Sequence, residues 1–215
     1  MRRPAAFGAA ALLTLASCRT AGPAPALPAD PAATARAVSA VLAARDEAWR
    51  PRRFKALFKG EVSPRVGPVV RGYLALFWDG EALAWRASVP LAGAGRSGTL
   101  RRSGGDAGEL FPGRLESRDV LSALLGVPEE APSGEGALWR GSRVELRLPS
   151  GAGRTVLVGP AGEVSGLVLP AGVRVEIAPG AGVPRRVEVT GPEGRALLTL
   201  ESFGPWPEGE EAPKG

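Results

Sequence analysis

The side chains that most often do chemistry in enzymes are nearly absent from this chain. It contains no His, Asn or Gln, and its only Cys is Cys18. A Ser-His-Asp triad, a Cys-His pair, a His-ligated metal and a CxxC cluster are therefore excluded. Carboxylates remain, and a pair of them can hydrolyse glycosides at the right separation. Most Glu residues alternate with Arg or lie in expected turns, so we expect no enzyme, no catalytic residue, no metal site and no cofactor.

The single Cys ends a segment that has the layout of a bacterial secretion signal. Arg2 and Arg3 form a charged start, and Phe7 to Leu15 form an apolar run too short to span a bilayer. The run ends in Leu15-Ala16-Ser17-Cys18, and a Leu, two small residues and a Cys resemble the lipobox of bacterial lipoproteins. The resemblance implies cleavage before Cys18, a diacylglycerol thioether on its sulfur and an acyl group on the new amino terminus.

The lipobox predicts a lipid-anchored protein of the outer membrane that faces the periplasm. Residue 19 is Arg, whereas Asp at this position favours inner-membrane retention in proteobacterial lipoproteins. An ordinary secretory peptide with a chance Cys is the alternative. Removal of Arg2 and Arg3 would lower the formal charge by two, from +5 to +3. That charge is too small, and too interspersed with Glu, to predict nucleic-acid binding.

Composition divides the chain into four parts. Residues 1–17 are the predicted signal peptide, and residues 18–29, rich in Pro and Ala, predict an extended tether from Cys18. Residues 30–207 predict one folded domain, which is long enough to bury a substantial core. Residues 208–215 predict an acidic flexible tail. We expect a monomer.

The periodicity of residues 30–207 predicts a mainly β domain with two short helices (α+β). Asp30-Pro31 predicts the start of a helix over 31–48, and a second helix is expected from a Ser117 cap to a Gly126 stop. Period-two patterns and turn residues predict strands at 54–62, 69–78, 83–89, 98–103, 109–111, 137–139, 143–148, 154–158, 164–169, 173–177, 184–190 and 195–202.

Strands with one apolar face need a cover for that face. We therefore expect a single strongly curved antiparallel sheet, a half-open β-barrel, that covers the two helices. The other face is predicted to be solvated and to carry cross-strand ion pairs. This expectation rests on charges that alternate with apolar residues, at Arg143, Glu145 and Arg147, at Arg174 and Glu176, and at Arg186 and Glu188.

The order of these features resembles the LolA/LolB superfamily, and its LolB-like outer-membrane lipoproteins in particular. The resemblance rests on the lipobox, the tether, a first helix, a strand with Gly60, the segment Val89-Pro90-Leu91-Ala92-Gly93, a short helix that ends in Gly126-Val127-Pro128, and late strands up to Trp206. It implies the half-open barrel and a role in accepting lipoproteins from a LolA-like periplasmic carrier. It also implies that Leu91, the match to an exposed Leu of the family, is a membrane-insertion residue.

A protein that handles lipoproteins must shield acyl chains from water. Each methylene is worth about 0.8 kcal/mol, so a sixteen-carbon chain in water costs on the order of 12 kcal/mol. We predict that acyl chains enter between the sheet and the second helix. The candidate lining residues are Phe54, Phe58, Tyr73, Phe77, Trp85, Val89, Val120, Leu121, Leu124 and Leu125. The alternative for each of them is a place in an ordinary hydrophobic core.

The sequence thus predicts an outer-membrane-anchored lipoprotein that binds acyl chains, accepts lipoproteins from a carrier and inserts them into the membrane. The expected partners are membrane lipid, a LolA-like carrier and lipoprotein cargo, and no nucleic acid. The alternative is a non-catalytic envelope lipoprotein that holds a periplasmic protein partner without transferring lipid. The polar segment Glu129–Gly136 favours this alternative, because the family has a second apolar helix there.

Overall fold

The computed structural model describes most of residues 53–207. The described residues are 53–89, 94–101, 111, 115–128, 130–140, 142–149, 153–159, 162–207 and 209, with isolated residues at 30, 33, 36, 39, 40 and 43. All the isolated residues except Asp30 have helical backbone. They fall within the helix predicted over 31–48, the rest of which lies outside the described residues.

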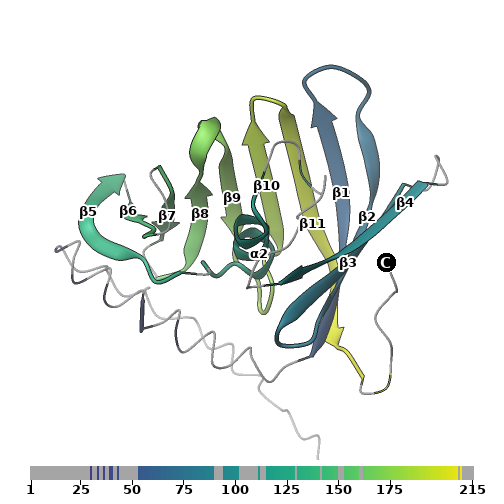
Figure 1. The fold of residues 1–215 in the computed structure, drawn as a ribbon, viewed down its shortest axis with the longest axis horizontal. Coiled ribbons are helices and arrows are strands. Elements are labelled where there is room, and N and C mark those ends of the chain that lie inside the picture. The colour runs from purple at the N-terminus through teal and green to yellow at the C-terminus, as the bar shows by residue number, and fades with distance from the viewer. Residues whose placement is uncertain are drawn as a thin grey trace, which may run out of the picture.

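The described chain forms one antiparallel sheet of eleven strands (Figure 1), in the order β4-β3-β2-β1-β11-β10-β9-β8-β7-β6-β5. Two meanders, β1 to β4 and β5 to β11, are joined by pairing of β1 with β11. Strands β4 and β5 are the two edges and do not pair with each other, so the sheet is open. The strands are β1 Phe54–Pro64, β2 Val70–Trp78, β3 Ala82–Val89, β4 Ala94–Arg101, β5 Ser133–Arg140, β6 Arg143–Arg147, β7 Thr155–Val158, β8 Val164–Val168, β9 Arg174–Ala178, β10 Arg186–Gly191 and β11 Gly194–Pro205.

This arrangement confirms the predicted single antiparallel half-barrel. Several strand limits differ from the predicted ones: β4 begins at residue 94 rather than 98, β5 begins at 133 rather than 137, and β11 continues to 205. Phe111, the only described residue of the strand predicted at 109–111, lies in a bend. Longer edge strands arise because pairing with a neighbour extends a ladder through Gly and Ser residues that have little strand preference of their own.

The turn between β2 and β3 follows from its residues. Asp79 Oδ1 accepts hydrogen bonds from the backbone N–H groups of Glu81 and Ala82, at 2.9 and 2.7 Å. Gly80 takes a positive φ of 104°, which a residue without Cβ adopts at little cost. Asp79, Gly80 and Glu81 separate β2 from β3, and the Asp79 N–H donates to the Ala82 carbonyl across the turn at 3.2 Å.

The helix α2 spans Ser117–Leu125 and has the predicted C-terminus. Gly126 follows it in the left-handed conformation, with φ 67°, and its N–H bonds to the Ser122 carbonyl. The N-cap is Glu116 rather than the predicted Ser117. Glu116 and Asp119 form a reciprocal capping box, which satisfies backbone N–H groups that a single Ser hydroxyl would leave open.

The outer face of the sheet, away from α2, carries the predicted ion pairs. Arg143 pairs with Glu176 at 3.0 Å, and Glu188 accepts from both Arg186 and Arg195 at 2.8 and 2.7 Å. These hydrogen bonds, from Arg195 first, lower the pKa of Glu188 below its ordinary value. The charged side chains of the solvated face therefore pair locally with one another. Each such pair contributes little to the free energy of unfolding.

Candidate functional site

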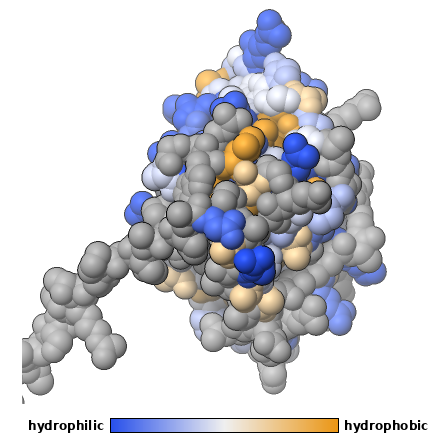
Figure 2. Space-filling model, turned by 90° about the vertical axis from the view of Figure 1, so that its left-hand side faces the viewer, coloured by the Kyte–Doolittle hydropathy of each residue, from blue (hydrophilic) through white to orange (hydrophobic). Residues whose placement is uncertain are grey.

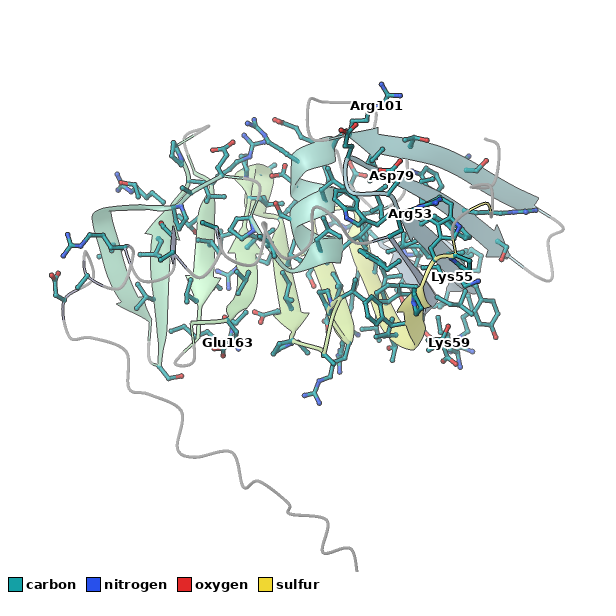
Figure 3. The ribbon with its side chains drawn as sticks, turned by 90° about the horizontal axis from the view of Figure 1, so that it is seen from below. Arg53, Lys55, Lys59, Asp79, Arg101 and Glu163 are labelled. Carbon is teal, nitrogen blue, oxygen red and sulfur yellow. The ribbon has the colours of Figure 1, made fainter. Side chains whose placement is uncertain are left out.

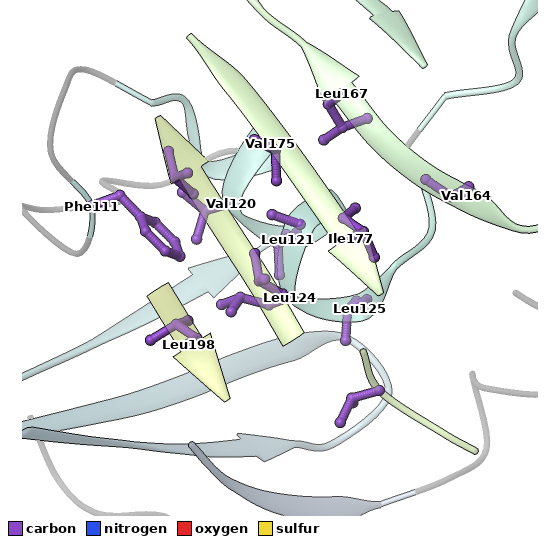
Figure 4. Packing of buried hydrophobic residues seen from close by; sticks show 14 of the residues in the cluster. Phe111, Val120, Leu121, Leu124, Leu125, Val164, Leu167, Val175, Ile177 and Leu198 are labelled. Carbon is purple, nitrogen blue, oxygen red and sulfur yellow. The ribbon is translucent and has the colours of Figure 1, made fainter. Parts of the chain in front are cut away.

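Helix α2 packs on the inner, concave face of the sheet and fills it. Figure 4 shows Val120, Leu121 and Leu124 pointing among side chains of the neighbouring strands, with Val175 and Ile177 of β9 close by. Every residue of α2 except Arg118 is buried. The helix is thus a plug inside the half-barrel, with its apolar side chains in one continuous hydrophobic cluster with the sheet.

The structure brings together seven of the ten predicted lining residues. They are between 0 and 8% exposed and belong to the same cluster as α2. Phe54 also lies 6.4 Å from Trp78, measured between ring centroids. An eighth residue, Val89, is half-buried at the end of β3. The seven are Phe54, Phe58, Trp85, Val120, Leu121, Leu124 and Leu125.

Tyr73 and Phe77 do not face the interior, which corrects the predicted lining. In β2 the buried positions are Leu74, Leu76 and Trp78, so Tyr73 and Phe77 point to the outer face. The Tyr73 side chain is 43% exposed. A strand that is apolar on both faces gives no periodic signal for which face is covered.

The Phe77 ring packs outside the sheet, edge-on against the residue that follows β11. Its centroid lies 5.6 Å from that of Trp206, and the Arg53 guanidinium stacks on the Trp206 ring at 4.1 Å. This aromatic-cation group covers the sheet where β1 starts and β11 ends. Phe77 is an apolar side chain on the outer face, and its contact with Trp206 leaves it half-buried without any ligand.

The indole nitrogen of Trp85 is a buried polar atom that finds no acceptor among the described residues. Trp85 is 5% exposed, and Gly98 on β4 leaves room for its ring, since a Cβ there would lie 2.9 Å from it. A buried N–H without an acceptor is uncommon.

A buried ionic cluster fixes the start of α2. Arg154, in the turn before β7, donates from Nε and Nη2 to the two Asp119 oxygens at 3.3 and 3.2 Å, and it also bonds Glu116. The Arg154 and Asp119 side chains are only 9 and 7% exposed. Arg118 extends the network outward to Glu130 at 3.0 Å. We call Arg154, Asp119 and Glu116 the helix latch.

The interactions within the helix latch shift the pKa values of Glu116 and Arg154. The hydrogen bond from Arg154 lowers the pKa of Glu116 below its ordinary value against the opposing effect of burial, and Arg118 adds to the lowering. Burial disfavours the charged form of Arg154, but its bonds to Glu116 and Asp119 outweigh that effect and raise its pKa. Glu116 and Arg154 therefore stay ionised at neutral pH. The sequence shows no signal for it, because Arg154 and Asp119 are 35 residues apart.

A pocket of about 330 Å³ opens beside the latch, at the end of the sheet that carries the β8–β9 and β10–β11 turns. Its walls are mainly apolar, and carboxylates of the latch and of Glu193 lie at its margin. Seen from the β5 end, hydrophobic side chains gather near the middle of the described surface, with hydrophilic ones around them (Figure 2). The lining residues are Leu115, Glu116, Asp119, Arg154, Leu169, Pro170, Ala171, Val173, Pro192 and Glu193.

The other predicted functional residues, Cys18 and Leu91, lie outside the described residues. Their flanks show only that β3 ends at Val89, which pairs with Ala94 at the start of β4. Within the described part of the chain, no helix is long and apolar enough to cross a bilayer. The lipidation of Cys18 and the insertion of Leu91 remain predictions.

Comparison with known proteins supports the fold. No protein-family model and no curated protein match the chain. A LolA superfamily protein from Nitrosomonas europaea matches 79% of this chain and 94% of its own, with a TM-score of 0.51 and 9% identity. A putative outer membrane lipoprotein-sorting protein domain from Vibrio parahaemolyticus matches 81% of this chain and 93% of its own, with a TM-score of 0.50 and 11% identity. The chain has a LolA/LolB-like fold.

Proposed function

We propose that this protein is a non-catalytic lipoprotein of the outer membrane, anchored through Cys18, that binds acyl chains between its sheet and α2. It accepts lipoproteins from a LolA-like carrier in the periplasm and passes them to the membrane. The observation that carries the proposal is the open sheet wrapped around one apolar helix. The similar fold of a domain named for lipoprotein sorting supports it.

An acyl chain can replace the contacts that α2 makes. The helix buries Val120, Leu121, Leu124 and Leu125, and each such side chain contributes about 1.5 to 3 kcal/mol, or on the order of 6 to 12 kcal/mol together. Burial of a sixteen-carbon chain is worth about 12 kcal/mol. Exchange of the helix for an acyl chain is therefore close to balanced in free energy.

The polar groups fit the same proposal. The unpaired Trp85 indole N–H inside the barrel matches the ester or amide carbonyl of an acylated amino terminus. The helix latch would set the affinity, because a ligand that needs α2 displaced binds more weakly in proportion to the rarity of the open state. Loosening the latch should then strengthen binding.

The test is acyl-chain binding by the full chain carrying Cys18→Ser, with a fluorescent fatty-acid probe and with native mass spectrometry for retained lipid. We expect saturable binding, and binding that is tighter by at least about tenfold for Arg154→Met, which corresponds to at least about 1.4 kcal/mol of weakened closure. Arg186→Met, on the outer face, is the matched control and should leave the affinity unchanged. Absence of binding by the folded protein and by both variants would refute the proposal.

A second candidate function, an envelope module that holds a protein partner without lipid transfer, is favoured by the packed interior. The large interior side chains Phe58, Leu121 and Leu124 are fully buried. For such a module we expect a folded protein with no saturable probe binding and no effect of Arg154→Met on the probe. The two functions are thus separated by one titration.

A further inference from the structure

The β1–β2 hairpin ends in an apolar tip that is fully exposed. The chain there runs Arg65-Val66-Gly67-Pro68-Val69-Val70-Arg71, and every residue of it is exposed. Val66 is 88% exposed, Val69 51% and Val70 40%. Gly67, with φ 117°, turns the chain. Scattered exposed apolar residues are common, but a contiguous group at a projecting point indicates an interaction surface.

The tip projects from the sheet and is held in place. β3 ends at Val89, beside Gly72, whereas pairing of β1 with β2 continues to Val70, so the end of the hairpin lies beyond the described part of β3. Figure 1 shows this hairpin rising above its neighbours at the upper edge of the sheet. The Arg65 N–H donates to the Glu193 carbonyl at 2.9 Å.

Cations and one Tyr follow the tip along the outer face of the hairpin. Lys59 is paired in register with Tyr73, and Figure 3 shows Lys59 on the side of the sheet away from α2. Arg71 also faces outward and forms an ion pair with Glu61 at 2.9 Å. Lys59 and Arg65 form no ion pair within the described part of the chain. We call Arg65, Arg71 and Lys59 the basic belt; all three are exposed.

We propose that the β1–β2 hairpin docks the protein on the surface of an anionic lipid bilayer. Val66, Pro68 and Val69 enter the headgroup region, where burial of apolar groups is favourable. The basic belt contacts lipid phosphates, with the aliphatic stems of Arg and Lys along the apolar boundary. Tyr73 takes the interfacial position that amphipathic aromatic side chains prefer.

The gradient of polarity selects a bilayer rather than a protein groove. Along the hairpin, away from the turn, the residues change from valines, through arginines, to the pair of Tyr73 and Lys59. This order matches the order of acyl chain, phosphate and water in a leaflet. A protein groove would need complementary walls around a convex tip. The inference does not depend on acyl-chain binding, because the tip is a turn at one end of the strands and does not lie in the interior.

The test places a reporter on the tip. In the full chain carrying Cys18→Ser, a single thiol is introduced by Val66→Cys and labelled with a polarity-sensitive fluorophore. Glu81→Cys, in the β2–β3 turn at the opposite end of the sheet and roughly 30 Å away, is the matched control. The vesicles contain equal parts of phosphatidylcholine and phosphatidylglycerol. We expect a blue shift, and quenching by a lipid-borne quencher, at position 66 only.

Vesicle partitioning of further variants completes the test. Val69→Asp should weaken binding about tenfold or more, because it removes apolar burial and adds a charge that the anionic surface repels. Arg65→Gln should weaken it about fivefold on these vesicles and leave binding to pure phosphatidylcholine unchanged. Ala181→Asp introduces the same charge as Val69→Asp at an exposed position in the β9–β10 turn. It should have little effect on vesicle binding.

Three outcomes would overturn the inference: no vesicle binding, binding without a spectral shift at residue 66, or equal shifts at residues 66 and 81. Binding through the apolar N-terminal segment alone gives the second outcome, since all variants share that segment. Capture of a protein by the tip, with no response to lipid, gives the first. Acyl-chain binding is measured in the separate fatty-acid titration. Its failure there would not change the outcome of the vesicle experiment.

Discussion

Removal of the Arg154 guanidinium tests whether the helix latch holds α2 in the barrel. The substitution Arg154→Met keeps an apolar stem of similar length and deletes the charge. Asp119, whose side chain is 7% exposed, would then be a buried carboxylate that retains only the Glu116 N–H as a bonding partner in the described structure, at 3.4 Å. Loss of one partner of a buried ion pair typically costs 3 to 5 kcal/mol, and we expect a loss of about that size.

The matched control is Arg186→Met on the outer face. Arg186 is 51% exposed and pairs with Glu188 at 2.8 Å, and exposed pairs contribute about 0 to 1 kcal/mol. Urea unfolding followed by Trp fluorescence gives both free energies, as shifts in midpoint at constant slope. The fluorescence reports the core directly, because Trp78 and Trp85 are buried there.

A double substitution separates charge from packing. If the cost of Arg154→Met comes from the uncompensated Asp119 charge, then Asp119→Asn in the Arg154→Met background should restore part of the lost stability, although Asp119→Asn alone is destabilising. A loss for Arg154→Met no larger than that for Arg186→Met would refute the reasoning. So would a double variant whose loss is the simple sum of the two single losses.

Three further predictions concern turns, strand contacts and pH. Gly126→Ala should cost about 1 kcal/mol or more of unfolding free energy, because φ is 67° and the new Cβ would lie 3.0 Å from a proline ring atom. Gly72→Ala should cost about 1 to 3 kcal/mol, because its Cβ would lie 2.2 Å from the Ser88 carbonyl oxygen and would push β2 from β3. The hydrogen bond from Arg154 lowers the pKa of Glu116, so the stability contributed by this carboxylate is present above its unfolded pKa and disappears as the pH falls through the lower, folded pKa.

Each of these has a control within the chain. Gly153→Ala has a similar φ of 83° but no atom near its Cβ, and Gly204→Ala has neither strain nor a close neighbour. The close contacts would be shown not to matter if Gly126→Ala lost no more unfolding free energy than Gly153→Ala. The same would follow if Gly72→Ala lost as little as Gly204→Ala. For pH, the stability lost on Glu116→Gln should shrink toward acid; a loss that stays constant or grows would contradict the sign.

The local elements of this fold could be predicted because their signals are local. Alternation in β1, where Phe54, Ala56 and Phe58 are buried, indicates a half-buried strand in any context. The stop at Gly126 and the turn at Asp79-Gly80 depend on backbone conformations that few other residues adopt. Ten lining residues could therefore be proposed, and the sheet and α2 could be placed within a few residues.

The face of a strand could not be assigned where both faces are apolar. Strand β2 reads Val-Arg-Gly-Tyr-Leu-Ala-Leu-Phe-Trp, and nothing in that order tells whether Tyr73 and Phe77 or Leu74 and Leu76 face the core. The neighbours decide, because α2 covers one side, while Trp206 and Arg53 cover Phe77 on the other. Strand pairing thus turned two predicted lining residues outward.

By itself the sequence determined the absence of His, Asn and Gln, the position of its one thiol, and the order of strands and helix, because these depend on residue identity and short-range spacing. Only the tertiary structure decided that β1 pairs with β11, that Arg154 and Asp119 meet across 35 residues, and that a hairpin of valines and arginines stands clear of the sheet. Those features are set by which distant segments share buried surface. Which distant segments pack together depends on the whole chain and cannot be predicted from any short stretch of its sequence.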